Sequence, residues 1–132
     1  MNLKKLEELT EAVFSELGEE GAILDIYLVP DRMMRKINRD FRGKDRPTTV
    51  LSFAPASGPR PDGTASFFGE IYLAPEFIKS HNESIGRLLV HGILHLCGFG
   101  HESRKERARM EKQEEKLEKT FSSRRGLRPL FN

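Results

Sequence analysis

The chain has 132 residues and a formal net charge of +2 at pH 7, and at this length we expect one domain, residues 1–132, with its own core. The charge is too small to indicate a partner, and the single cysteine excludes an internal disulfide and fits a reducing compartment. No stretch approaches ~18 apolar residues, and residues 1–18 lack the apolar core of a signal peptide, so we expect a cytoplasmic protein without a membrane partner.

Hydrophobic periodicity divides the first half of the chain into helices and strands. Apolar residues recur at helical spacing from Leu3 to Leu17, whereas the segment before Pro30 is rich in the branched and aromatic residues that strands favour. Asp31 is a suitable cap for a second helix. The predicted elements are helix 2–17, strand 22–29, helix 31–41, strand 48–53 and an exposed, mobile loop over 54–67.

The second half is predicted to contain the central helix of the fold. Ser80 and Glu83 have the spacing of a capping box, and the residues that follow are apolar around most of the helix, as in a buried helix. The predicted elements are strand 68–73, a turn or helix 74–79, helix 80–97, a charged helix 102–121 and a frayed end 122–132. This order indicates an α+β fold, in which a small mixed sheet of three to four strands packs against helices.

Three of the four histidines lie within eleven consecutive residues of the central helix and its end. His91 and His95 are four residues apart, so they stand on one helix face, close enough to share a metal ion. Gly98 suits the turn that ends the helix, and Gly100 gives a second flexible point that lets His101 return to the same ion. This spacing predicts one zinc ion per chain on these three histidines, with an open fourth position of the catalytic type.

Hydrolysis is the reaction class that such a site favours. Neutral imidazoles leave zinc its full charge, which lowers the pKa of water at the ion to about 7 and makes hydroxide available. Helical zinc peptidases carry a glutamate directly after the first histidine as general base, whereas this chain has Gly92 there. A base could instead come from Glu70 or Glu102, and three imidazoles also suit nickel, copper or iron.

A basic segment precedes the second strand. Arginine binds phosphate oxygens in a bidentate fork, and cations near a metal ion suit a polyanionic substrate. An arginine close to the zinc could also stabilise the additional charge of a phosphodiester transition state. Seven cations fall within fifteen residues: Arg32, Arg35, Lys36, Arg39, Arg42, Lys44 and Arg46.

Three segments resemble conserved blocks of the YbeY family of bacterial endoribonucleases. Residues 91–101, HGILHLCGFGH, closely resemble the family signature HGxLHLxGYDH. Residues 41–53, FRGKDRPTTVLSF, resemble the second block, and residues 69–71, GEI, are similar to the third, which usually has Gly-Asp followed by an apolar residue. Because the blocks occur in the family's order, the chain is identified as a YbeY-like metal-dependent hydrolase.

The resemblance implies a single-strand-specific, zinc-dependent endoribonuclease with its metal on the three histidines. The family's arginine, which is thought to act on the RNA, falls on Arg42, and Lys44 and Arg46 are further candidates for binding phosphate. The implied task is maturation of ribosomal RNA, notably the 3′ end of the small-subunit RNA, together with ribosome quality control. The implied partners are the small ribosomal subunit, its RNA precursor and ribosome assembly factors.

The chain departs from the family pattern at three of these positions. Gly100 replaces an aspartate that could orient a ligand, Glu70 replaces another aspartate, and Phe99 replaces a tyrosine. Two alternatives stay open: a zinc peptidase, against which Gly92 counts, and a non-catalytic RNA-binding module of ribosome assembly whose zinc only stabilises the fold. The nucleophile also stays open between water and the RNA 2′-hydroxyl.

Overall fold

The computed structural model describes residues 3–55, 67–98 and 103–132. Within these residues the chain forms five α-helices, a short 3-10 helix and a three-stranded mixed sheet, which confirms the expected α+β class. The elements are α1 (Leu3–Glu16), β1 (Ile23–Leu28), α2 (Asp31–Arg42), β2 (Val50–Phe53), β3 (Phe67–Leu73), α3 (Pro75–Ser80), α4 (Ile85–Leu96), α5 (Arg104–Ser122) and η1 (Arg128–Phe131). None of the helices in the described residues is long and apolar enough to cross a membrane.

The sheet has the order β1-β3-β2, so β3 is its central strand. β3 runs parallel to β1 and antiparallel to β2, with Ile71 opposite Ile26 on one side and Ser52 on the other. Side chains alternate between the two faces of a strand, so Ile71 and Leu73 point to one face and Glu70 and Tyr72 point to the other. This alternation decides which residues can join the site described below.

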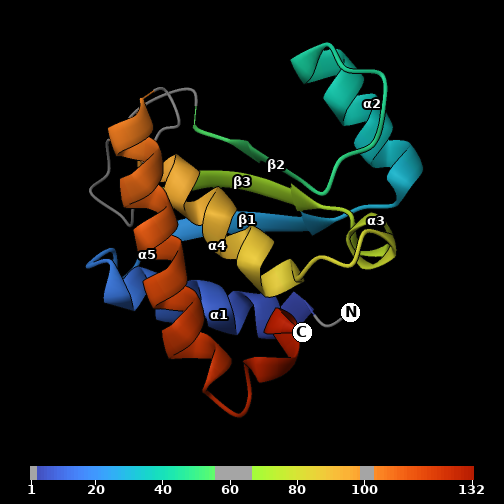
Figure 1. Ribbon diagram of the computed structural model, residues 1–132. Helices are drawn as coiled ribbons and strands as arrows, with labels where there is room; N and C mark the ends of the chain where they lie inside the picture. The colour runs from blue at the N-terminus through green and yellow to red at the C-terminus, as the bar shows by residue number, and fades with distance from the viewer. Residues whose placement is uncertain (1–2, 56–66, 99–102) are drawn as a thin grey trace.

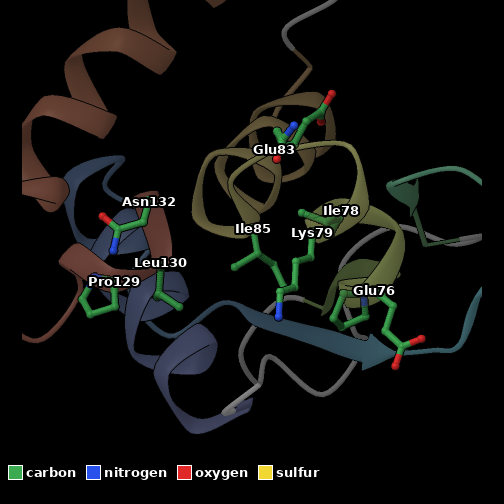
Figure 2. A pocket seen from close by; sticks show the side chains of 10 residues that line it. Glu76, Ile78, Lys79, Glu83, Ile85, Pro129, Leu130 and Asn132 are labelled. Carbon is green, nitrogen blue, oxygen red and sulfur yellow. The ribbon is translucent and has the colours of Figure 1, made fainter.

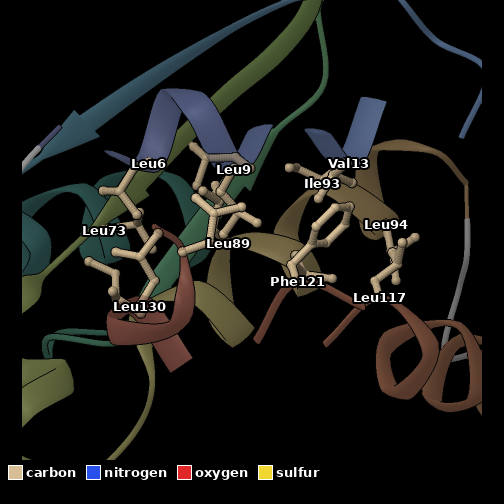
Figure 3. Packing of buried hydrophobic residues seen from close by; sticks show 14 of the residues in the cluster. Leu6, Leu9, Val13, Leu73, Leu89, Ile93, Leu94, Leu117, Phe121 and Leu130 are labelled. Carbon is tan, nitrogen blue, oxygen red and sulfur yellow. The ribbon is translucent and has the colours of Figure 1, made fainter. Parts of the chain in front are cut away.

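The helices α1, α4 and α5 enclose the core on one face of the sheet (Figure 1). Figure 3 shows leucines, Val13, Ile93 and Phe121 from α1, β3, α4, α5 and η1 meeting in one apolar cluster. α4 contacts both β2 and β3 and is buried along most of its length, as the sequence predicts. α2 lies away from this core, beyond the end of the sheet at which β1 and β3 terminate (Figure 1).

Two glycines let neighbouring chain segments approach α4 closely. A Cβ at Gly92 would lie 2.9 Å from Cδ1 of Ile71, and a Cβ at Gly86 would lie 2.7 Å from the carbonyl oxygen of Leu130. Both distances are shorter than real Cβ contacts allow, so a side chain at either position would push a neighbour away. Close packing therefore compensates the helix propensity that glycine lacks.

Three local predictions differ from the structure. The central helix begins at Ile85 behind the cap residue Ser84, because Ser80 is taken up as the last residue of α3. Asp31 is the first residue of α2 rather than its cap. The C-terminal end is not frayed, because its apolar side chains Leu127 and Leu130 are buried against the core. Most of the predicted loop 54–67 lies outside the described residues.

Candidate active site

His91 and His95 lie together on consecutive turns of α4, near its C-terminal end. Their Nε2 atoms are 3.1 Å apart, and their ring centroids are 4.6 Å apart. Both residues are half-buried, so each ring has one side against protein and one side accessible from outside. The spacing of four residues thus brings the two nitrogens to one point, as the sequence predicts.

Glu114 of α5 fixes the orientation of His91. Its Oε1 lies 2.5 Å from Nδ1 of His91, and the two side chains are only 20% and 31% exposed. A carboxylate accepts, so Nδ1 carries the hydrogen that it donates, and Nε2 is left to accept or to bind a metal. Carboxylates commonly hold metal-binding histidines in this way.

Glu114 is absent from the site residues that the sequence predicts, because a mostly charged helix indicates a surface position. A signal was nevertheless present. Glu114 is four residues after Met110 and three before Leu117, and both of these side chains are buried. A carboxylate in the apolar stripe of a helix faces the core, and there it needs a partner.

The two histidines fit a zinc ion in chemistry and in spacing. Zinc binds imidazole nitrogen at 2.0–2.1 Å in tetrahedral sites, which separates two ligand nitrogens by about 3.3 Å. The observed 3.1 Å between the two Nε2 atoms is close to this value. The predicted third ligand, His101, lies outside the described residues, and within those residues no three histidine, cysteine or carboxylate side chains form a metal-binding group.

A pocket of about 450 Å³ opens beside the two histidines. Its walls come from α4, from β2 and from the last residue of α2. It is lined by Arg42, Val50, Leu51, Ser52, Ala54, His91, Gly92, His95 and Leu96. The tertiary structure therefore joins the histidine block and the basic block of the sequence at one cavity.

Arg42 reaches this pocket from the end of α2. Its guanidinium donates a hydrogen bond of 2.9 Å to the carbonyl oxygen of Ser52 and lies 4.6 Å from the ring centroid of Phe53. The helix ends at Gly43, whose φ of 72° lets the chain turn away directly after the arginine. These contacts hold the guanidinium over β2, at the rim of the cavity.

Lys44 and Arg46, the other predicted phosphate-binding residues, are exposed on the turn after α2. Neither is among the described residues that line the pocket. The turn itself is ordered by buried Asn38, whose side-chain amide donates to the carbonyl oxygen of Arg46 at 2.8 Å. It is also held by Arg35, which bonds Asp45 at 2.9 Å and keeps the pKa of that carboxyl below its usual value.

The two candidates for a general base are not placed beside the histidines. Glu70 points from the face of β3 opposite to Ile71 and α4, and it accepts a hydrogen bond of 3.2 Å from the hydroxyl of Tyr72. It does not line the pocket as far as the structure describes the chain. Glu102 lies outside the described residues.

A second cavity, of about 560 Å³, lies at the opposite end of α4, between α3 and η1 (Figure 2). Figure 2 shows Ile85 and Leu130 on its apolar side and Glu76, Lys79 and Glu83 on its charged side. Ile85 is ten residues from His95, or about 15 Å along the helix, so this cavity is separate from the histidine site.

Comparison with known proteins places these features in a family. The family model described as Endoribonuclease YbeY matches residues 1–122. Among curated relatives, the chain is 38% identical over 122 residues to Endoribonuclease YbeY of Rhodopseudomonas palustris, covering 85% of this chain and 63% of that protein. It is 37% identical over 119 residues to the protein of the same name from Sulfurihydrogenibium sp., covering 81% of this chain and 74% of the relative.

A solved structure is similar as well. The solution structure of TM1509 from Thermotoga maritima aligns with a TM-score of 0.55 at 28% sequence identity. The alignment covers 94% of this chain and 86% of that one. The chain thus spans less than two thirds of the first of these curated relatives but most of this structural neighbour.

Proposed function

The chain belongs to the YbeY family of endoribonucleases, and on this premise we propose that it is a zinc-dependent endoribonuclease acting on single-stranded RNA. The observation that carries the proposal is the pocket in which His91, His95 and Arg42 meet. A metal-binding pair and a phosphate-binding cation at one cavity are the two groups that phosphodiester hydrolysis requires.

The histidines hold the metal in this proposal, with His101 as the third ligand. Bound zinc supplies Lewis acidity toward the phosphate and makes hydroxide available near neutral pH. Glu114 accepts the hydrogen from Nδ1 of His91, which keeps Nε2 of that ring deprotonated and aimed at its neighbour on His95. The carboxylate therefore prepares the ligand for the metal before the metal binds.

Arg42 binds the scissile phosphate. One of its five N–H donors is engaged by the carbonyl oxygen of Ser52, which leaves others for a phosphate oxygen. A guanidinium held at the pocket rim stabilises the extra negative charge that develops when the phosphorus is attacked. Lys44 and Arg46, exposed on the following turn, attract the neighbouring phosphates of the strand.

Ribosomal RNA is the substrate that we propose, in particular the 3′ end of the small-subunit RNA during its maturation. The small ribosomal subunit and its assembly factors are the corresponding partners, in the cytoplasm, with a role in ribosome quality control. Support for this assignment comes from family membership and from the basic turn after α2.

The pocket favours a nuclease over a zinc peptidase. The peptidase base would stand at Gly92, but a Cβ there would lie 2.9 Å from Cδ1 of Ile71, facing the sheet. A glutamate at this position could not reach the cavity without displacing the central strand. Glu70 also faces away from the histidines, so neither position supplies the carboxylate that peptide hydrolysis uses.

The deciding experiment measures zinc per chain and cleavage of a ribosomal RNA precursor for wild type, His95→Ala and His81→Ala. His81 is an exposed histidine that stacks on Phe77, which makes it a matched control. We expect about one zinc and cleavage in wild type and His81→Ala, and loss of both in a folded His95→Ala. Wild type that takes up no zinc, or that cleaves peptides and not RNA, would refute the proposal.

The ends of the products identify the nucleophile. Attack by water leaves a 5′-phosphate on the downstream fragment if the bond to the 3′ oxygen breaks. Attack by the RNA 2′-hydroxyl leaves a 2′,3′-cyclic phosphate on the upstream fragment. A substrate with a 2′-deoxy sugar at the cleavage site separates the two, because only the first route survives that substitution.

A further inference from the structure

Four aromatic rings form a continuous row on the face of the sheet that points away from α4. The ring centroids of Phe41 and Phe53 are 5.6 Å apart, those of Phe53 and Tyr72 are 5.7 Å apart, and those of Tyr72 and Tyr27 are 4.8 Å apart. Tyr27 and Tyr72 are directly opposite each other in the parallel register of β1 and β3, and their rings stack with an interplanar angle of 18°. We call these four residues the aromatic row.

The two ends of the aromatic row are open. Phe41 is 67% exposed and Tyr27 is 41% exposed, so each offers ring surface to a ligand. Phe53 and Tyr72, between them, are half-buried. The core helices pack on the other face of the sheet, so within the described residues no helix covers the row (Figure 1).

The row begins at the active-site pocket. Arg42, which lines the pocket, is the residue after Phe41, and its guanidinium lies 4.6 Å from the ring centroid of Phe53. A strand whose phosphate is held by Arg42 therefore has its neighbouring bases within reach of these rings. The row and the histidine pocket are two sides of one arginine.

The charges on this face assign bases and phosphates to different places. Asp25 and Glu70 are opposite each other in the register and stand on the same face as the two tyrosines. Carboxylates repel phosphate but accept hydrogen bonds from the amino groups of bases. The cations lie at the α2 end, on Arg42 and on the exposed side chains of Lys44 and Arg46.

We propose that the aromatic row is a stacking platform for unpaired bases of the RNA strand that enters the pocket, with Phe41 and Tyr27 each receiving a base. The inference rests on the proposed function and names how its substrate is selected. Aromatic side chains bind single strands without regard to sequence, because every base has a π face. Paired bases have no free face, so the platform selects single-stranded over double-stranded RNA.

The chain offers a direct spectroscopic reporter for this proposal. It has two tyrosines and no tryptophan, and both tyrosines belong to the row. Stacked bases shift the ring proton resonances of tyrosine upfield. We expect a short single-stranded RNA to shift the Tyr27 ring protons, and an RNA duplex of the same sequence to leave them in place.

Binding measurements on variants complete the test. Affinity for the single strand should fall roughly tenfold in Tyr27→Leu and in Phe41→Leu, whereas Tyr27→Phe should bind like wild type because it keeps the ring. Affinity for the duplex should not change in any of them. Met33→Ala is the control, since it removes a side chain that is 44% exposed on α2 outside the row.

Each other outcome overturns the platform in a recognisable way. Leucine variants that bind the single strand like wild type, in a protein that still cleaves RNA, would refute the platform and leave the proposed function intact. Tyrosine resonances that respond to a lysine- and arginine-rich peptide and not to RNA would make this face a protein-docking surface. A wild-type protein that neither binds nor cleaves RNA would refute the proposed function together with the platform.

Discussion

The two helices that border the pocket, α4 and α2, each contain twelve residues but are held in opposite ways. α4 buries seven residues between the sheet, α1, α5 and η1, whereas α2 buries Met34 and Asn38 alone among its own residues. α4 carries the histidines and α2 carries the arginine. A metal ligand needs a position fixed to tenths of an ångström, and a well-packed core provides such a position.

The arginine has a different requirement. It must meet a large, flexible substrate, and a helix at the periphery exposes it to that substrate. Its own helix is held mainly by polar contacts at one end, those of Asn38 with Arg46 and of Arg35 with Asp45. In this contrast α4 supplies precision and α2 supplies access, and the following changes test it.

The largest expected effect is on folding, through Leu89 of α4. Leu89 is fully buried, and Leu89→Ala should lower the free energy of unfolding by about 3 kcal/mol, through lost apolar contact and the cavity left behind. Met33→Ala on α2 should change it by less than about 0.5 kcal/mol, because that side chain is 44% exposed. Urea denaturation measures both, and equal losses would remove the contrast between the helices.

The next effect is on catalysis, through Arg42. Arg42→Ala should lower the cleavage rate by about 10²- to 10³-fold, the usual loss when a donor to a charged transition state is removed. Zinc content and the urea midpoint should stay at wild-type values, since the side chain is exposed and α2 contributes little to the core. Arg32→Ala, which changes an arginine in the first turn of α2, is the control. A fall in zinc content in Arg42→Ala would contradict the division between the two helices.

A smaller effect is expected at Glu114, which extends the precision of α4 to α5. Glu114→Gln should weaken zinc binding about 10- to 100-fold, because the amide holds the Nδ1–H of His91 less strongly than the carboxylate does. Chelator competition measures this in the absence of RNA. Glu115→Gln changes an exposed neighbour and should bind zinc like wild type. If both variants bind zinc equally, the contact between Glu114 and His91 has no role in holding the ligand.

The smallest effect is expected where α2 ends. Gly43 has a φ of 72°, and a Cβ added there would meet no atom within 4 Å, so Gly43→Ala carries only the backbone cost, about 1 kcal/mol. Gly126→Ala is the control, because Gly126 does not have a positive φ and its Cβ would be 3.4 Å from the flexible end of Lys5. Urea denaturation of both variants should show a loss in the first only. A loss of cleavage in Gly43→Ala larger than its loss of stability would show that the turn positions Arg42.

Local periodicity was enough to predict most of the helices and strands. The spacing of His91 and His95 requires only a helix to bring their nitrogens together, and the apolar residues around them predict that helix. The chemistry of that pair, the fold class and the family followed from short segments whose residues are neighbours in the chain. The ends of elements were less predictable, since Ser80 and Ser84 are both acceptable caps and the packing of α3 selects between them.

Contacts between distant segments could not be predicted in this way. Glu114 is 23 residues from His91, and of the cations around the basic turn it is Arg42 that lines the pocket, while Lys44 and Arg46 stay exposed. The burial of Leu130 against Gly86 likewise depends on where the chain returns. Sequence spacing defines which residues share a face, because that depends on backbone geometry alone. Which faces meet depends on the burial summed over the whole core, and so it emerges only when all the elements have packed.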